Sequence, residues 1–319
     1  MFLRLVAIFV LPIFLLAKEI LVIQSYSSDF SWDKTYTESL SKELGSSHNL
    51  TFFEMNTKNI PKSEFSKMAE KAFQVYEEKK PDLVVLGDDN ALQYVGPLLE
   101  NSNTPIVYLG INNNPRHYFK DLPDNITGVL ERPNLKRSVV YLSEIIPDSK
   151  KILILFDDGV TSDIVKSEYF GKKDKTIIDG CDVEIKQISS TSEWEKTILD
   201  AKDLYDFIIV GLYQTIKDES GKVMSMDNII TWTSENSQLP LFGFWDFSIG
   251  KNKTIGGYVI SAEEMGKKAA VIVKMVFNGK KPQEILPISE NDGRFLFSKS
   301  QVEKWKLDIP KKFKVSFIE

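Results

Sequence analysis

Cysteine and histidine are almost missing from this sequence of 319 residues. It contains one cysteine, Cys181, and two histidines, His48 and His117. A single cysteine has no partner for an internal disulfide, and so few thiol and imidazole groups exclude the usual cysteine–histidine zinc sites and most histidine-based catalysis. We expect Cys181 to be a small buried or half-buried residue, and we predict neither a metal site nor a cofactor.

An excess of positive charge is also missing. The sequence holds 45 aspartates and glutamates against 40 lysines and arginines, a net charge of -5, whereas nucleic-acid binders typically carry a basic excess. We therefore expect no nucleic-acid partner. Hydrophobic residues make up 42% and charged residues 27% of the chain, which excludes disordered and collagen-like proteins. The length of 319 residues is typical of two domains.

The longest apolar stretch lies at the beginning of the chain. Residues 1–17 read MFLRLVAIFVLPIFLLA, with one arginine followed by an apolar run from Leu5 to Leu16. This pattern is typical of a secretory signal peptide. The alternative is an uncleaved membrane anchor, but spanning a bilayer takes about 20 apolar residues, and this run is shorter. We expect cleavage near Ala17 and export to a periplasm.

Short apolar runs recur along the rest of the sequence, each followed by a polar or glycine-containing loop and then by a helical pattern. Several runs are continuous rather than alternating, as expected of strands buried on both faces of a parallel sheet. They span residues 20–24, 83–86, 106–109, 152–156, 207–210 and 241–244. Strands that alternate with helices predict an α/β fold with a parallel sheet.

Helix-start signals and one proline divide this pattern into two series. Capping boxes at 192–195 and 261–264 each predict the start of a helix, and the second helix is expected to end at residues 278–279. Pro133 disfavours helix at Arg132, so we expect an extended crossover there before the strands restart near Lys151. The sequence predicts two similar α/β lobes, each a parallel sheet flanked by helices, with a cleft between them.

The loops at the strand ends are rich in hydroxyl, amide, carboxylate and aromatic side chains. Ligands of open parallel sheets bind outside the carboxyl ends of the strands. Aromatic rings give a large contact area and can hold a cation, while carboxylates accept ammonium or hydroxyl groups. The side chains that we expect to contact a ligand are Tyr26, Ser27, Trp32, Asp88, Asp89, Asn112, Tyr213, Trp245 and Asp246.

Each of these residues also has a purely structural alternative. Trp32 can pack at the start of the first helix, and Trp245 can pack at a hinge. One of Asp88 and Asp89 caps the next helix, so at most one of them contacts ligand. Two further tryptophans at 194 and 232 lie in predicted helices away from the strand ends, and we expect both in the core.

The sequence gives little support to the hypothesis that the protein is an enzyme. The nucleophile elbow G-x-S-x-G, the phosphate loop G-x-x-x-x-G-K-[ST] and the zinc motif H-E-x-x-H do not occur. The acidic pairs at 88–89 and 157–158 are reminiscent of phospho-accepting receiver domains, but an export signal argues against that cytoplasmic role. A hydrolase with paired carboxylates has no supporting spacing. We therefore predict that the protein is not an enzyme.

Several stretches together resemble a known family. They are IQSY at 23–26 with Trp32 soon after, PDSKKI at 147–152 before a strand, and IGGY at 255–258 followed by GKKAA at 266–270 and NG at 278–279. In these features the chain resembles the uncharacterised substrate-binding proteins of ABC transporters, which belong to the type I periplasmic binding protein superfamily. The likeness covers nearly all of the chain after the signal peptide.

The resemblance implies two Rossmann-like lobes and a particular division of the chain between them. Three crossovers would join the lobes, with residues 18–130 and 260–280 in the first lobe and residues 131–259 and 281–319 in the second. Some relatives bind aromatic amino acids, so an amino acid is the leading ligand class, with sugars and nucleosides as alternatives.

We therefore predict a monomeric periplasmic solute-binding protein that closes on a small polar ligand and delivers it to an inner-membrane ABC permease. The alternative is a ligand-presenting sensor subunit that docks on a membrane signalling protein such as a histidine kinase.

Overall fold

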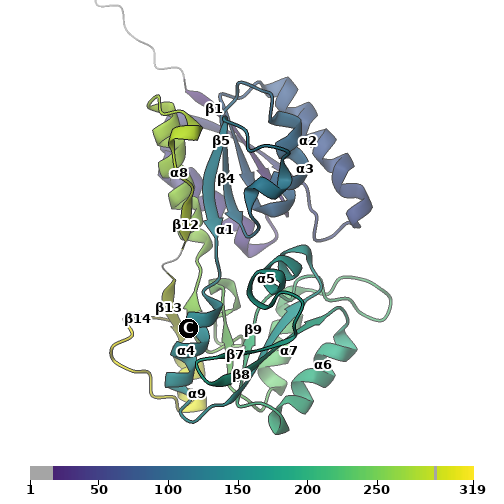
Figure 1. Ribbon diagram of the computed structural model, residues 1–319, viewed down its shortest axis with the longest axis vertical. Helices are drawn as coiled ribbons and strands as arrows, with labels where there is room; N and C mark the ends of the chain where they lie inside the picture. Colours follow the sequence, from purple (N-terminus) through teal and green to yellow (C-terminus); the bar gives the residue numbers. More distant parts are fainter. Residues whose placement is uncertain (1–16, 291–292) are drawn as a thin grey trace, which may run out of the picture.

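The chain forms two α/β lobes, one above the other in Figure 1. The structure is a computed structural model that describes residues 17–290 and 293–319. The predicted signal peptide, apart from Ala17, lies outside these residues. Each lobe contains one sheet with helices on both faces, so the predicted α/β class with flanked parallel sheets is confirmed. None of the helices among the described residues could span a bilayer.

The sheet of the first lobe is entirely parallel. Among the described residues it has six strands, in the order β12-β5-β4-β3-β1-β2. The strands are β1 Lys18–Gln24, β2 His48–Glu54, β3 Leu83–Gly87, β4 Ile106–Ile111, β5 Ile126–Glu131 and β12 Ile288–Glu290. The central strands β3 and β4 are buried along their whole length, as their continuous apolar runs predict.

Alternate side chains of β1 show how both faces of this sheet are covered. Ile20 and Val22 belong to one apolar cluster together with residues of α1 and α8. Leu21 and Ile23 belong to a second cluster together with residues of α2 and α3. Because successive side chains of a strand point to opposite faces, one strand contributes to both cores. The helices are α1 Ser31–Leu44, α2 Phe65–Lys79, α3 Asp88–Leu99 and α8 Ala262–Phe277.

The sheet of the second lobe is mixed at its edges. It has eight strands within the described residues, in the order β14-β13-β11-β10-β9-β6-β8-β7; β7 runs antiparallel to β8, and β13 runs antiparallel to β11. The strands are β6 Lys151–Asp157, β7 Lys175–Ile178, β8 Cys181–Ile188, β9 Phe207–Val210, β10 Leu241–Gly243, β11 Gly256–Val259, β13 Arg294–Ser298 and β14 Val315–Ile318. The helices are α4 Leu135–Ile145, α5 Val160–Phe170, α6 Thr191–Asp200, α7 Met226–Asn236 and α9 Lys299–Trp305.

The six predicted strands are all present, with ends within two residues of the prediction. The helix predicted after Ser261 is α8, which ends at Phe277 as expected. The predicted cap near Ser192 is two residues out, because Ser190 is the N-cap of α6 and accepts a hydrogen bond from the Glu193 amide. Trp194 is buried in the core, as predicted, whereas Trp232 is half-buried and packs against the edge of that core. Cys181 is buried, as expected.

The chain passes between the lobes at three places. It leaves the first sheet after β5, returns between β11 and α8, and leaves again between β12 and β13. At the first passage α4 begins only at Leu135, so the chain is not helical at Arg132, as Pro133 predicts. The Arg132 guanidinium donates hydrogen bonds of 2.7 Å to the carbonyls of Ile111 and Asn112 and so ties this passage to the end of β4.

The predicted lobe boundaries remain a proposal, and strand pairing refines one of them. After α8 the chain stays beside the first sheet, where β12 pairs with β5 from Ile288 to Glu290. On this evidence we propose that the third passage follows Glu290 rather than residue 280.

Candidate functional site

Loops from the carboxyl ends of both sheets line one cavity between the lobes. The loop after β1 and the start of α3 come from the first lobe, and the loops after β6, β9 and β10 come from the second. This is where ligands bind in open parallel sheets. The lining residues are Tyr26, Phe30, Trp32, Lys58, Asp88 and Glu131 from the first sheet's side, and Thr161, Leu212, Trp245 and Phe247 from the second.

The cavity is small because the lobes are close together. Its volume is about 20 Å³, which is room for about one water molecule. Two grooves of about 440 and 370 Å³ adjoin it and share Tyr26 and Lys58 with it. A larger hollow of about 610 Å³ lies along β7 and β8, away from the lobe interface. We place the candidate site between the lobes, because aromatic and ionisable side chains converge there from both.

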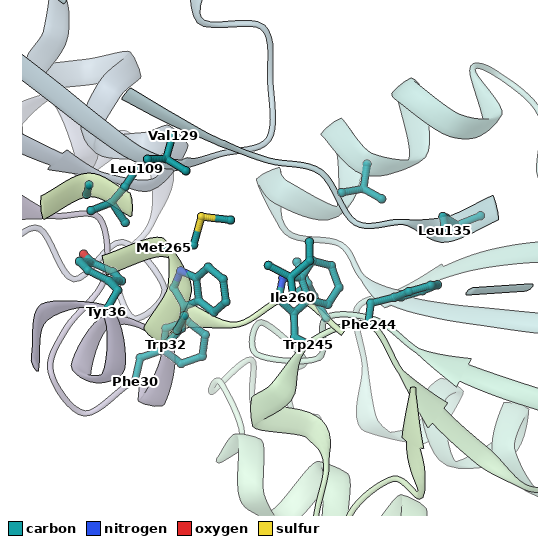
Figure 2. Close-up of a cluster of buried hydrophobic side chains, with 14 of the residues drawn as sticks. Phe30, Trp32, Tyr36, Leu109, Val129, Leu135, Phe244, Trp245, Ile260 and Met265 are labelled. Atoms are coloured by element: carbon teal, nitrogen blue, oxygen red, sulfur yellow. The ribbon is translucent and has the colours of Figure 1, made fainter. Parts of the chain in front are cut away.

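Aromatic rings from the two lobes meet at Phe247. Its ring centroid lies 5.9 Å from that of Phe30 and 6.3 Å from that of Trp32, both from the first lobe. Within its own lobe, Phe247 stacks on Trp245 with 6.2 Å between centroids and 19° between planes. Figure 2 shows Phe30 and Trp32 on one side and Trp245 on the other. The site therefore offers flat apolar walls from both lobes.

Each tryptophan of these walls donates its indole N–H to a buried carboxyl group. Trp32 Nε1 lies 3.2 Å from Asp88 Oδ2. Trp245 Nε1 lies 2.6 Å from Glu131 Oε1, and this bond joins the second lobe to the last residue of β5. A further interlobe contact is the 3.4 Å hydrogen bond between the hydroxyls of Tyr26 and Thr161. The two indole–carboxyl bonds fix the orientations of the tryptophan rings and place two carboxyl groups beside the aromatic walls.

Burial makes three carboxyl groups at this site hard to ionise: those of Asp88 and Glu131, and that of the nearby Asp33 on α1. Burial raises the pKa of Glu131 to about 8 and the pKa of Asp33 to about 8. Burial, together with the charges of Asp33 and Glu131, raises the pKa of Asp88 well above its usual range. A buried carboxylate is costly unless an opposite charge or donor compensates it. A cation bound beside Asp88 and Glu131 would supply that compensation.

The nearest cationic side chain is Lys58, which follows β2. Its Nζ lies 4.4 Å from the ring centroid of Tyr26 and 4.7 Å from that of Phe30. Burial lowers the pKa of Lys58, while the neighbouring carboxylates Asp157 and Asp88 oppose this effect.

Four of the nine predicted site residues line the cavity: Tyr26, Trp32, Asp88 and Trp245. Ser27 lines the adjoining 370 Å³ groove. Two of the others brace a loop, because the Asp89 carboxylate accepts bonds from the amides of Asn112 and Asn113 at 2.9 and 3.1 Å. These nine assignments to a ligand remain predictions.

The remaining two predicted residues point elsewhere. Tyr213 is buried in the core of the second lobe, and its ring lies 6.2 Å from that of Phe247. Asp246 is 3.4 Å from the Arg294 guanidinium, with which it forms an ion pair. Neither side chain lines the cavity.

Six lining residues were missed at the sequence level. Phe30 and Thr161 lie in strand-end loops that already drew attention, and Phe247 directly follows Trp245–Asp246. Glu131 ends a strand of the first lobe, and the local sequence does not indicate which residues of the second lobe will lie beside it. Lys58 follows β2, whose side chains are half-buried or exposed, and the sequence of this strand shows no continuous apolar run. The full set of missed residues is Phe30, Lys58, Glu131, Thr161, Leu212 and Phe247.

Comparisons with known proteins identify the family and the fold of the chain. The family model described as ABC transporter substrate binding protein matches residues 21–317. None of the curated proteins matches the chain. Among solved structures, the chain is similar to an ABC domain from Streptococcus pneumonia in complex with L-Trp, with 18% identity, 95% of this chain and 100% of that chain covered, and a TM-score of 0.70.

Two further structures extend the likeness. One is the ligand-free, open form of a substrate-binding protein with adhesive properties from Clostridium difficile (16% identity, 95% and 99% coverage, TM-score 0.65). The other is a periplasmic binding protein/LacI transcriptional regulator from Alkaliphilus metalliredigens in complex with D-xylulofuranose (12% identity, 86% and 94% coverage, TM-score 0.54). At these identities the likeness establishes the fold, which is the predicted type I fold of periplasmic binding proteins.

Proposed function

Because the chain belongs to the ABC transporter substrate-binding protein family, we propose that it captures a small ligand between its lobes and delivers it to the permease of an ABC transporter. Proteins of this family typically work outside the cytoplasmic membrane and are in general not enzymes. A cleaved signal peptide, a periplasmic location, a monomeric state and the lack of catalytic activity are part of the proposal.

We infer that the ligand is a small molecule with a flat aromatic face and an ammonium group, with an aromatic amino acid as the leading candidate. The observation that carries this inference is the pair of indole–carboxyl contacts, Trp32 with Asp88 and Trp245 with Glu131, on facing sides of one cavity. Aromatic walls suit a flat ring, and the buried carboxyl groups suit a cation. The L-Trp complex of the pneumococcal structure supports the same ligand class.

The residues take different roles in this proposal. Tyr26, Trp32 and Trp245 contact the faces of the ligand, and Asp88 binds its ammonium group. The other predicted residues act from outside the cavity, where Asp89 braces the loop at Asn112. Sugars and nucleosides are the alternative ligands; five of the ten lining residues are aromatic, which favours a ligand with a flat ring.

Binding requires the lobes to separate. A space of about 20 Å³ cannot admit an amino acid, so the ligand enters an opened form and the lobes close on it. The ligand contacts both lobes only in the closed form, and it therefore shifts the population toward closure.

The first experiment is native mass spectrometry of the freshly purified protein, followed by calorimetry with L-tryptophan, tryptamine and indole-3-propionate. We expect L-tryptophan and tryptamine to bind and indole-3-propionate, which lacks the ammonium group, to bind at least tenfold more weakly. Asp88→Asn should weaken the binding of both amines by about tenfold or more, since hydrogen bonds to a charged group contribute about 1.5–3 kcal/mol.

Asp182→Asn is the matched control, because Asp182 is exposed on β8 and its loss should leave affinity unchanged. Tight binding of a sugar or nucleoside with no binding of the indole amines would contradict the proposed ligand class. Equal affinity of wild type and Asp88→Asn would show that Asp88 does not bind the ammonium group of the ligand. The predicted sensor role has no supporting observation in the structure, and we do not propose it.

A further inference from the structure

The Lys58 ammonium occupies the rim of the aromatic site. It lies over the faces of Tyr26 and Phe30, at 4.4 and 4.7 Å from the ring centroids, and these two rings form an edge-to-face pair 5.3 Å apart. Lys58 also lines the inner cavity and both adjoining grooves. It therefore stands between the interior of the site and the two adjoining grooves.

Lys58 has acidic surroundings but no direct acidic partner. The carboxyl groups of Asp157, Asp88, Asp33 and Glu131, when ionised, each favour the charged form of Lys58. Within the described residues, however, Lys58 forms no ion pair, and its ammonium contacts the two aromatic faces. A half-buried ammonium held over aromatic ring faces is the arrangement by which many proteins bind ligand cations.

The side chain can vacate this position without a change of the backbone. A lysine has a flexible four-carbon stem and a compact charge, and the 440 Å³ groove next to it is also lined by Asp157 and Asp158. That groove offers the ammonium a second acidic and more solvated position. The inner cavity, by contrast, holds about 20 Å³ while Lys58 stays in place.

We propose that Lys58 is an internal substitute for the ligand: its ammonium shares the small cavity with Asp88 when no ligand is bound, and the ligand's own ammonium displaces it into the groove. This inference rests on the proposed function, since it assumes that the interlobe cavity is the binding site. It adds that ligand selection is a competition between two cations, in which an uncharged or anionic aromatic molecule cannot replace Lys58.

The decisive variant is Lys58→Met, which keeps the length and apolar stem of the side chain but removes its charge. Because Lys58 competes with the ligand, we expect Lys58→Met to bind tryptamine more tightly than wild type. A cation–aromatic contact contributes about 0.5–2 kcal/mol, which corresponds to a gain of about 2- to 30-fold in affinity. Indole-3-propionate should not gain in this way. Calorimetry measures both affinities.

Lys71→Met serves as the matched control, because Lys71 is an exposed lysine on α2 in the same lobe and its loss should leave the affinity for tryptamine unchanged. Near-ultraviolet circular dichroism establishes that each variant is folded, and Lys58→Gln replaces Lys58→Met if the latter does not fold. Unchanged or weaker tryptamine binding by the Lys58 variant would overturn the proposal, weaker binding indicating that Lys58 contacts the ligand directly.

A second probe separates this inference from the ligand class proposed above. Tetramethylammonium carries the charge without an aromatic face, and its binding is followed by tryptophan fluorescence. If no indole binds either protein but tetramethylammonium binds Lys58→Met more tightly than wild type, the cation competition stands and the aromatic ligand class fails. If tryptamine binds wild type and Lys58→Met equally, the competition fails and the binding function stands. If no probe binds Lys58→Met, the competition is overturned.

Discussion

Asp88 combines an unusual backbone with a buried carboxyl group. It is the first residue of α3, and its φ of 67° lies in the left-handed region, which aspartate tolerates better than most residues but still at a cost. Gly110 lies opposite, where a Cβ atom would come within 3.4 Å of the Asp88 carboxyl carbon. The conformation directs the Asp88 carboxyl toward Trp32 and the cavity, which is the position that the proposed ammonium anchor needs.

The buried carboxyl groups predict a stability that falls as the pH rises. Glu131 has a pKa of about 8 in the folded protein against an ordinary value of 4.5, mainly because of burial. The folded state therefore keeps a proton that the unfolded chain releases above about 4.5, so the contribution of Glu131 to stability is fully present below that pH and is lost progressively as the pH rises through about 8. The melting temperature of wild type, measured from pH 5 to 9, should fall by several degrees.

Glu131→Gln should flatten this dependence, because glutamine does not ionise. It should not remove it, because burial also raises the pKa of Asp33 to about 8. The exposed Asp182→Asn provides the control and should keep the wild-type slope. A stability that rises across this range, or a Glu131→Gln slope equal to that of wild type, would contradict the assignment of Glu131 as a buried proton carrier.

Individual site residues were predictable where position along a strand determines them. Tyr26, Asp88 and Trp245 follow continuous buried strands, so the rule for parallel sheets finds them. Lys58 could not be found in this way, since lysines are mostly exposed and no local pattern marks one that a neighbouring lobe covers. Glu131 contacts Trp245 across the interface, and this contact depends on how the lobes meet rather than on either segment alone.

At the scale of elements, the packing of α8 on α1 depends on one glycine. A Cβ atom at Gly266 would lie 2.4 Å from the carbonyl oxygen of Tyr36 and 2.9 Å from Cβ of Ser39. These are contacts with neighbouring atoms that cannot simply rotate away, so the two helices would have to separate. The close approach brings α8 against the first sheet, although α8 follows a strand of the second.

We therefore expect Gly266→Ala to destabilise the protein by about 1–3 kcal/mol, as overpacking typically does, despite the higher helix propensity of alanine. Chemical denaturation measures the change. Val271→Ala in the same helix is the control, because Val271 is 46% exposed and should cost much less. A Gly266→Ala protein as stable as wild type would show that the helices can move apart freely.

Continuous apolar runs predicted buried strands, but not those whose run is interrupted by glycine, such as β5 and β11. The strands β3, β4 and β9 are buried at every residue and gave continuous apolar runs. Half-exposed edge strands such as β2 and β14 give weak patterns and were missed. The start of α6 shows a tertiary effect, because a bridge between Ser190 and Lys217 places Ser190 in extended backbone immediately before the helix.

For the whole molecule, the main prediction concerns closure of the lobes. Phe247 contacts Phe30 and Trp32 across the interface, and each aromatic pair contributes about 0.5–1.5 kcal/mol. Phe247→Ala should weaken closure by roughly 1 to 3 kcal/mol. Small-angle scattering of the ligand-free protein should then show a larger radius of gyration than wild type, with tryptamine reducing it again.

Phe317→Ala provides the control for this experiment, because Phe317 is 47% exposed on the edge strand β14 and lies in neither wall of the cavity. Its radius of gyration should equal that of wild type. An unchanged radius for Phe247→Ala would mean that the remaining contacts, including the Trp245–Glu131 bond, are sufficient to keep the lobes together.

The return of the chain to the first lobe also sets the order in which the protein can be completed during synthesis. α8 packs on α1, and β12 adds to β5, so the first lobe receives its last helix and its last strand from residues 262–290. Until the ribosome has made that segment, Tyr36 and Leu40 of α1 have no α8 to cover them. Contacts between segments so far apart form slowly. We expect a nascent chain that ends at Val259 to expose this apolar face, to be digested readily by proteases and to bind chaperones.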